Sequence, residues 1–202
     1  MPERAYKSSR NESVRLFKSD FVDFFSRVHP ATPLVLYLPL IGASFYFAIQ
    51  QLPILSVALW FALGLAVWTL LEYVIHRYAF HYEPGSKIGK QLHFIVHGVH
   101  HDYPNDAKRL VMPPVVSVPL AIIFYGVFVF LFGTAAPAVW AGLVAGYLCY
   151  DSIHYAIHHF PMGGRIFSRL KQHHLRHHYQ DDHAGYGVSS PLWDYVFGTN
   201  RK

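Results

Sequence analysis

The chain has 202 residues, of which 52% are hydrophobic and 17% aromatic, while only 14% are charged; the formal net charge is +5 with neutral histidines. This length fits one domain, and so few charges are unusual for a water-soluble globular protein. The single cysteine, Cys149, excludes a disulfide framework and a thiolate metal cluster. The charged start of the chain lacks the apolar core of a cleavable secretory signal. Histidine is the anomaly, because fourteen of the fifteen histidines lie between residues 76 and 183.

Residues 1–30 are predicted to form a basic amphipathic segment. Phe17, Phe21, Phe24 and Phe25 recur at helical spacing among six Lys and Arg residues. This pattern favours a helix that lies on a membrane surface. A loose charged tail that contains a short helix is an equally good interpretation.

Two long stretches without any charged residue follow, at residues 31–71 and 111–150. A break around Pro53 divides the first stretch, and a second break at 133–137 divides the other. Each part is close to the ~20 residues that a transmembrane helix needs. The pattern predicts four transmembrane helices in two hairpins, at the following ranges: about 31–50, 53–75, 114–133 and 136–153. A soluble bundle of apolar helices is disfavoured, because so short a chain cannot cover this much apolar surface.

The distribution of basic residues predicts the topology. All seventeen Lys and Arg residues lie before residue 30, from 77 to 109, or from 165 to the end. Under the positive-inside rule these segments are cytoplasmic, and so are both termini. We therefore expect an all-α, multi-pass membrane protein with a cytoplasmic helical cap formed by residues 76–110 and 154–202. Since every histidine cluster belongs to this cap, one site can be assembled from all of them.

Four groups of histidines have the spacing of metal ligands. Two groups follow the pattern i, i+3, i+4 and one follows i, i+4, so their imidazoles project from one side of a helix. The pair His76 and His81, at i, i+5, better suits the frayed end of a helix. Ten histidines are too many for one ion, so we predict a dimetal site, and ligation by nitrogen alone favours iron, zinc, copper or nickel. The predicted ligands are His76, His81, His97, His100, His101, His154, His158, His174, His177 and His178.

Further polar residues lie near these groups but outside the spacing rule. Asp151 precedes His154 by one turn, and Glu72 precedes His76 by one turn. Each carboxylate is interpreted either as an acceptor for the second nitrogen of a ligating imidazole or as a helix-end charge at the membrane boundary. The residues predicted to support the ligands or face the substrate are His93, Asp151, His159, His173 and His183.

Longer motifs resemble the integral-membrane fatty acid hydroxylase and sterol desaturase superfamily, and most closely its fatty acid 2-hydroxylase branch. They include Leu92-His-Phe-Ile-Val-His-Gly-Val-His-His101 and Arg109-Leu-Val-Met-Pro-Pro114. The others are Gly146-Tyr-Leu-Cys-Tyr-Asp-Ser-Ile-His-Tyr155, Leu170-Lys-Gln-His-His-Leu-Arg-His-His178 and Gly185-Tyr-Gly-Val-Ser-Ser-Pro-Leu-Trp-Asp-Tyr195. The resemblance covers about residues 65–200.

The resemblance implies that residues 31–202 form a single fatty acid hydroxylase-like membrane domain. Its cap would hold two metal ions on the ten histidines, with iron in the active enzyme and zinc as an alternative in a purified sample. No catalytic residue beyond these ligands is expected. The implied reaction is hydroxylation at C2 of a long acyl chain, free or within a ceramide, with O2 and external electrons. Tyr147, Tyr150, Tyr155 and Phe94 are candidates to line the path of the acyl chain.

Because no cytochrome b5-like domain precedes this region in the sequence, we expect a separate cytochrome b5-like or ferredoxin-like electron donor. The same feature favours a bacterial inner membrane over the endoplasmic reticulum of a eukaryote.

Alternative functions are weaker. Oxidation of a sterol or carotenoid by the same dimetal site is the nearest, although the stretch from Arg109 to Pro114 argues against it. A metal transporter would place ionisable residues inside its spans, and residues 31–71 and 111–150 contain none. A dizinc hydrolase would use carboxylate ligands and a general base. Nucleic-acid binding is unsupported, because the basic residues are spread over three segments beside apolar spans.

Overall fold

The structure is a computed structural model that describes residues 7, 8, 10 and 12–200. Within these residues the chain forms helices and no strand, which confirms the all-α prediction. The remaining parts of the predicted N-terminal segment, residues 1–6, 9 and 11, lie outside the described residues, as do residues 201–202 at the end of the predicted domain.

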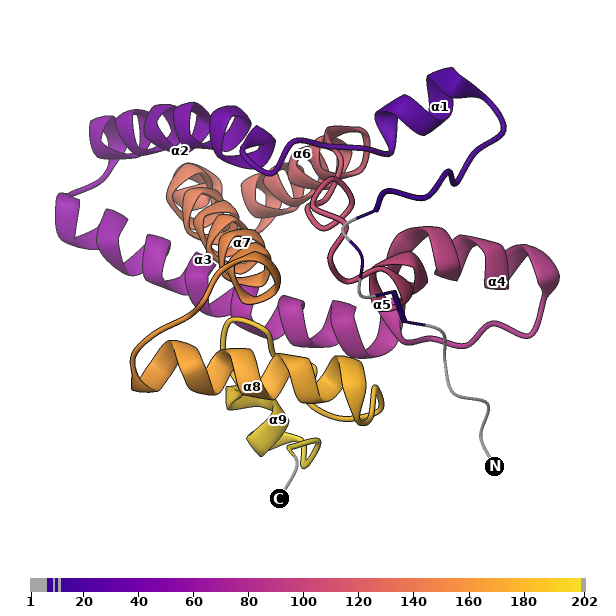
Figure 1. Ribbon diagram of the computed structural model, residues 1–202. Coiled ribbons are helices and arrows are strands. Elements are labelled where there is room, and N and C mark those ends of the chain that lie inside the picture. Colours follow the sequence, from indigo (N-terminus) through magenta and orange to yellow (C-terminus); the bar gives the residue numbers. More distant parts are fainter. Residues whose placement is uncertain (1–6, 9, 11, 201–202) are drawn as a thin grey trace.

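Four long helices follow the apolar stretches of the sequence closely (Figure 1). Their bounds are Thr32–Gln51 (α2), Ile54–Val74 (α3), Pro114–Phe132 (α6) and Ala136–His159 (α7). By length and hydropathy, three helical stretches of the described chain can cross a membrane: Thr32–Gln51, Ile54–Phe80 and Pro114–His159. The third stretch contains both α6 and α7, which are separated by one short 3-10 turn (η3, Gly133–Ala135).

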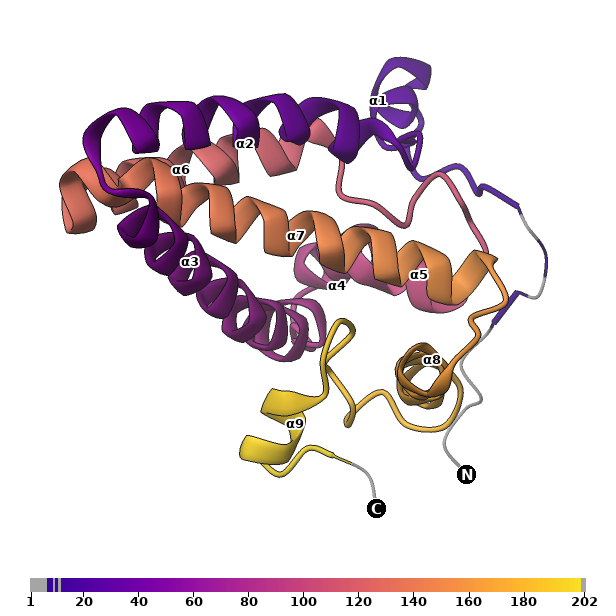
Figure 2. The ribbon, with the colours of Figure 1, turned by 90° about the vertical axis from the view of Figure 1, so that its left-hand side faces the viewer.

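Helix α7 is the centre of the molecule, and α2, α3 and α6 pack around it (Figure 2). It crosses α3 at backbone contact, because a Cβ atom on Gly64 would lie 2.0 Å from the Val139 carbonyl oxygen. From the side of α7, a Cβ on Gly142 would lie 2.0 Å from the carbonyl oxygen of Phe61 in α3. Only glycine fits at both positions, which is the kind of close approach that membrane helices use.

The outer faces of the long helices are apolar and exposed. Val35 on α2 and Phe130 on α6 are 75% and 87% exposed, and many similar side chains lie beside them. A monomer in water rarely exposes such continuous apolar surface, whereas lipid would cover it.

The remaining helices form a cap at the end of the bundle where α3 and α7 finish (Figure 2). Two of them are π-helices, which have wider turns than α-helices. The cap helices are Ile75–Phe80 (η1), Lys87–His93 (α4), Phe94–Gly98 (η2), Val99–Asp102 (α5), Arg165–Tyr179 (α8) and Leu192–Val196 (α9).

The N-terminal segment is helical only at Asp20–Phe25 (α1). The prediction of one amphipathic helix through all four phenylalanines is therefore wrong, since Phe17 precedes the helix. The physical reason is Asp23, whose Oδ1 accepts hydrogen bonds from the backbone N–H groups of Leu16 and Phe17 at 2.8 and 3.3 Å. These bonds fold residues 16–17 back against α1, so the helix cannot begin earlier.

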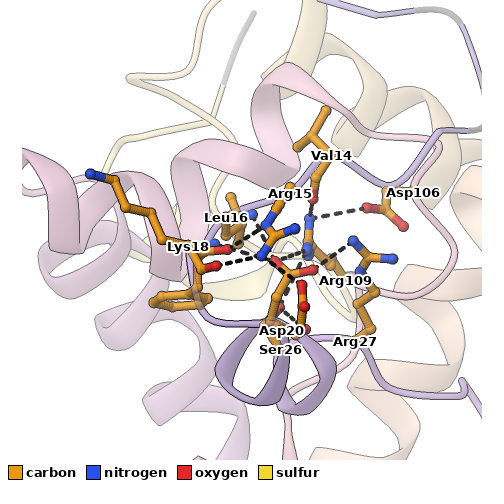
Figure 3. Close-up of polar contacts among 11 residues, drawn as sticks. Val14, Arg15, Leu16, Lys18, Asp20, Ser26, Arg27, Asp106 and Arg109 are labelled. Atoms are coloured by element: carbon orange, nitrogen blue, oxygen red, sulfur yellow. Dashed lines mark hydrogen bonds and ion pairs between the residues drawn. The ribbon is translucent and has the colours of Figure 1, made fainter.

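A buried ion pair fastens this segment to the cap (Figure 3). The side chains of Arg109 and Asp23 are 3% and 8% exposed, and Arg109 Nη2 lies 3.1 Å from Asp23 Oδ1. Arg109 also donates to the Val14 carbonyl oxygen and to the Ser26 hydroxyl. Arg109, which belongs to one of the longer motifs, therefore holds the N-terminal segment in place and lies apart from the histidines.

Candidate dimetal centre

The ten histidines predicted as ligands lie in two adjacent groups of five. Within each group, one ring nitrogen of every residue lies within 4.8 Å of those of the others. Group one consists of His76, His81, His97, His101 and His177. Group two consists of His100, His154, His158, His174 and His178. The groups touch, since the rings of His101 and His178 stack with their centroids 4.2 Å apart.

The nitrogen atoms in each group are spaced as ligands of one ion would be. In group one, His97 Nε2 lies 3.2 Å from His76 Nε2 and 3.0 Å from His101 Nε2. In group two, His174 Nε2 lies 3.1 Å from His158 Nε2 and 3.0 Å from His178 Nε2. Two imidazole nitrogens bound at right angles to one ion at about 2.0–2.1 Å would be about 3.0 Å apart. The donor geometry therefore fits one metal ion in each group.

Histidines four residues apart on one helix share a group. The pairs four residues apart stay together: His97 with His101 in group one, and His174 with His178 in group two. The residue three positions after the first member of each pair, His100 or His177, belongs to the other group. Helices η2–α5 and α8 thus each contribute to both groups.

The pair His76 and His81 shares group one because residues Ile75–Phe80 form a π-helix. The His81 backbone N–H donates to the His76 carbonyl oxygen at 3.2 Å, which is the i, i+5 bond of that helix. The pair lies at the end of a helix, as expected, but this end is a regular π-helical turn and is not frayed. The wider turn brings residues five apart onto one side.

A loop after α8 orients group one. His76 donates through Nδ1 to the carbonyl oxygen of Tyr186, and His177 donates through Nδ1 to that of Ala184 at 2.8 Å. Backbone acceptors of this kind fix the tautomer of a ligating imidazole and leave its Nε2 free for the metal. Residues 184–190, which we call the orienting loop, therefore hold two members of group one.

Two buried carboxylates hold the orienting loop. Asp194 accepts hydrogen bonds from the backbone N–H groups of Tyr186 and Gly187 at 2.9 and 2.8 Å. Glu72 accepts bonds from the N–H groups of Val188 and Ser189 at 2.7 and 2.8 Å. Glu72 thus binds the loop, and its effect on the imidazoles is indirect.

Asp194 was not among the predicted site residues, although it stands in the motif that ends at Tyr195. The glycines of that motif are informative. Gly185 has a φ of +76°, and a Cβ on Gly187 would lie 2.0 Å from the Ser190 carbonyl oxygen. Because other residues would not fit this tight loop, the glycines were a signal that it has a structural purpose.

Group two lacks such partners at several nitrogens. His154 has both ring nitrogens buried without a hydrogen-bond partner in the described part of the chain. The same holds for His100 Nε2, His174 Nδ1 and His178 Nδ1. An unsatisfied buried polar group costs about 1–3 kcal/mol. A metal ion would take up His100 Nε2 and one nitrogen of His154, whereas His174 and His178, whose Nε2 atoms meet inside the group, keep an Nδ1 atom without a partner among the described residues.

Burial keeps the clustered histidines of the two groups neutral. Burial and the neighbouring imidazoles lower the pKa of His81 and that of His177 to about 3. The same causes hold the pKa values of His97, His100, His174 and His178 well below the ordinary range. A neutral imidazole is the form that binds a metal, so the site is ready to ligate at neutral pH.

The other predicted site residues surround the two groups. His93 donates through Nε2 to the Phe80 carbonyl oxygen at 2.6 Å. His173 Nε2 lies 3.2 Å from Asp194 Oδ2 and so joins the network that holds the orienting loop. Both residues support the cap from outside the two groups.

Asp151 is buried near the end of α7, where it accepts a hydrogen bond from the backbone of Met112. The ring of His159 stacks on Tyr155, with centroids 4.4 Å apart. His183 is exposed, with Nε2 3.6 Å from Asp182 Oδ1. These three residues also lie outside the two groups of five.

An apolar cavity of about 70 Å³ lies between the long helices and the histidines. Tyr150, on its wall, has its ring centroid 5.6 Å from that of His154. Phe80, also on the wall, stacks on His97 at 4.8 Å. Among the predicted path residues, Tyr147 and Tyr150 line this cavity, whereas Tyr155 and Phe94 line surface hollows elsewhere. No histidine in the described part of the chain lines the cavity, and the rings of Phe80 and Tyr150 lie between it and groups one and two.

Known proteins match this chain over most of its length. The family described as fatty acid hydroxylase matches residues 61–199. A dihydroceramide fatty acyl 2-hydroxylase of Arabidopsis thaliana is 38% identical over 195 residues, which cover 93% of this chain and 80% of the relative. A ceramide very long chain fatty acid hydroxylase of Saccharomyces cerevisiae is 41% identical over 169 residues, which cover 82% of this chain and 44% of the relative.

A solved structure described as full-length scs7p, with only the hydroxylase domain visible, superimposes with a TM-score of 0.86. It is 37% identical in sequence, and the match covers 91% of this chain and 70% of that chain. The range matched by the family, residues 61–199, includes all ten clustered histidines.

Proposed function

The chain belongs to the fatty acid hydroxylase family and is an oxidoreductase, and from this premise we propose that it is a membrane-bound dimetal monooxygenase. Its substrate would be a long-chain acyl lipid, hydroxylated at C2 of a fatty acid or of a ceramide acyl chain. The observation that carries the proposal is the pair of five-histidine groups beside an apolar cavity. The names of the plant and yeast relatives support the acyl substrate.

Groups one and two would each hold one metal ion, and iron is the metal we propose for the active enzyme. The bound metals would supply the reduction of O2 that an unactivated C–H bond requires, which acid–base groups alone cannot supply. Nitrogen-only donor sets suit iron, copper, nickel and zinc, and of these only iron and copper are common partners of O2 chemistry. Zinc would bind the same donors and give an inactive protein.

The residues of the chain have three tasks in this proposal. The orienting loop keeps the Nδ1 protons of His76 and His177 on carbonyl oxygens, so that both Nε2 atoms face the ion. Burial keeps the imidazoles neutral. The apolar walls exclude water from the place where the C–H bond reacts.

The cavity fits an acyl chain that enters from the membrane. Its lining comes from α2, α3, α6 and α7, including Trp68, Phe124 and Leu143. Tyr150 and Phe80 form the end that meets the histidines. Since C2 is next to the carbonyl carbon, the polar head of the lipid would stay at the cap while the tail follows the cavity.

We also propose four membrane crossings in two hairpins, with the cap and both termini in the cytoplasm. In support, α6 and α7 run back along each other, since Trp140 Nε1 donates to the Ala121 carbonyl oxygen at 2.8 Å. The glycine between them, Gly133, has a φ of +53° that suits a sharp turn. Because α3 continues into η1 and α7 reaches His159, the long helices and the cap are continuous, which supports a single domain over 31–202.

The test is mass spectrometry of total lipid acyl chains from a host that expresses the protein under 18O2, with iron and a competent reductant supplied. We expect 18O-labelled 2-hydroxy acyl chains from the wild type and none from His97→Ala. Labelled sterols or carotenoids would refute the acyl substrate while keeping the dimetal oxygenase. No labelled product of any kind from a metal-loaded wild type would refute the oxygenase.

A further inference from the structure

Helix α8 carries an arginine stripe that the two histidine groups leave unexplained. Arg165, Arg169 and Arg176 are exposed and, at 100° per residue, fall within about 40° of one another around the helix axis. His174, fully buried in group two, projects from the opposite side of the same helix. We define the arginine stripe as these three residues.

The stripe is unpaired. None of the three guanidinium groups makes an ion pair or hydrogen bond within the part of the chain that the structure describes, and α8 itself contains no acidic residue. By contrast, Arg109 and Arg27 both pair with Asp23. Three aligned positive charges without an intramolecular partner suit an acidic partner from outside.

A surface hollow beside the stripe leads towards group one. It has a volume of about 490 Å³, and Arg169 and Arg176 line it together with His173, His177 and Tyr195. His177 is the inner wall, and its Nε2 lies 3.0 Å from His81 Nε2 within group one. Arg and Tyr are the residues that protein interfaces favour at their centres, and the outer rim of this hollow provides both.

We propose that the arginine stripe and its hollow are the docking surface for an acidic one-electron carrier protein that reduces the dimetal centre through group one. The proposal rests on the proposed function. Converting R–H and O2 to R–OH and water consumes two electrons and two protons, so a one-electron carrier must be oxidised twice for each product. An α-helix with its side chains is about 10–12 Å across, so a carrier at the stripe is one helix away from the histidines.

The matched variants reverse two charges on different faces of the cap. Arg165→Glu/Arg169→Glu alters the stripe, and Lys87→Glu/Lys90→Glu makes the same change in net charge on α4. All four positions are exposed, so both double variants are expected to fold, and none of the four residues belongs to either histidine group. Circular dichroism and metal content check that each variant is intact.

The probes are a reduced plant-type ferredoxin and a reduced soluble cytochrome b5 domain, both acidic. Their binding and their oxidation by the metal-loaded enzyme are followed at increasing ionic strength. We expect the stripe variant to bind the better carrier, and to oxidise it, about tenfold more weakly at low salt, because charge steering contributes about 10–1,000-fold. The difference should shrink as salt screens it, and the lysine variant should remain within about twofold of wild type.

Three results would overturn the proposal. The stripe variant could match the wild type with both carriers, both variants could lose affinity equally, or the stripe variant could lose binding to anionic phospholipid vesicles while its affinity for the carriers stays unchanged. The last result would assign the stripe to the membrane surface. Product formation with ascorbate and a small mediator separates this test from that of the proposed function, because it needs no carrier. Carrier binding is measured directly, so it can be judged even if no lipid product forms.

Discussion

Groups one and two have the same composition, five histidines each, but the protein holds them differently. In group one, His76 and His177 are held through Nδ1 by carbonyl oxygens of the orienting loop. In group two, five ring nitrogens are buried without a partner among the described residues, and His154 accounts for two of them. Group two is also the more completely buried, with four of its five members below the surface against three in group one.

Groups one and two therefore obtain their geometry in different ways. Group one is preorganised by hydrogen bonds that persist without metal, whereas His154, His174 and His178 of group two have no hydrogen-bond partner at Nδ1 among the described residues. An ion would therefore fix more of the geometry of group two. Group one also borders the surface hollow, through His177. A half that is rigid and near the surface suits electron uptake, and a half that is deeply buried suits the protected side of the reaction.

Removal of metal should produce the largest effect and should affect the groups unequally. A ligand at a thousand times its dissociation constant stabilises by about 4 kcal/mol, so chelation should lower the unfolding midpoint by about 8–16 °C. Hydrogen exchange should rise most at residues 154–158, which serve group two alone, and least in the orienting loop. Equal exchange in both segments, measured by mass spectrometry with and without chelator, would refute the difference between the groups.

The sequence predicted much of this centre because its signals are local. The charge-free stretches predicted where the four long helices begin and end to within a few residues. The exception is the end of α7, which extends to His159. Helical spacing identified the ten clustered histidines, and their identity as metal ligands stays a prediction. The division into groups was beyond the sequence, because His97 and His100 lie three residues apart and yet belong to different groups.

Long-range contacts explain what the sequence missed. The π-helix at Ile75–Phe80 has no simple composition signal, and it alone brings His76 and His81 together. Asp194 acts through a loop whose other anchor, Glu72, is more than a hundred residues earlier in the chain. The Asp23–Arg109 pair likewise joins segments that are 86 residues apart. Such partners are settled by packing, which a single sequence does not encode locally.

Loss of the Asp23–Arg109 ion pair should lower the stability of the fold without altering either histidine group. Arg109→Ala removes an ionic partner of the buried Asp23 and Asp106, while Arg27 still pairs with Asp23. We expect the free energy of unfolding to fall by about 1.5–3 kcal/mol, the usual contribution of a hydrogen bond to a charged group. The control is Arg15→Ala, because Arg15 and Asp20 form an exposed pair whose loss should cost less than about 1 kcal/mol. Chemical unfolding gives the stability, and metal analysis should still give two ions per chain. Loss of one ion would mean that the Asp23–Arg109 pair also shapes the centre.

Disturbing the orienting loop should affect group one alone. Asp194→Asn removes the charge that accepts bonds from Tyr186 and Gly187, so the carbonyl oxygens for His76 and His177 become less fixed. We expect one of the two ions to bind about 10–100-fold more weakly, the usual cost of removing such support. Competitive chelator titration measures this, with the exposed Asp182→Asn as control. If both ions lose affinity by the same factor, the orienting loop supports both groups and not group one alone.

The pH dependence of the folding stability of the metal-free protein should report on single histidines of group one. The folded pKa of His81, about 3 because of burial and then neighbouring imidazoles, lies below its ordinary value near 6.5. The unfolded chain therefore binds more protons than the folded chain between these values, so stability falls as pH falls from about 6.5 towards 3.

Between pH 6 and pH 5, the free energy of unfolding of the His81→Gln variant should fall by about 1 kcal/mol less than that of the wild type. The control is His183→Gln, which replaces an exposed histidine outside both groups. Urea unfolding at pH 7, 6 and 5 provides the measurement. An unchanged slope in His81→Gln would mean that His81 is protonated in the metal-free fold, and that group one is less rigid than its hydrogen bonds indicate.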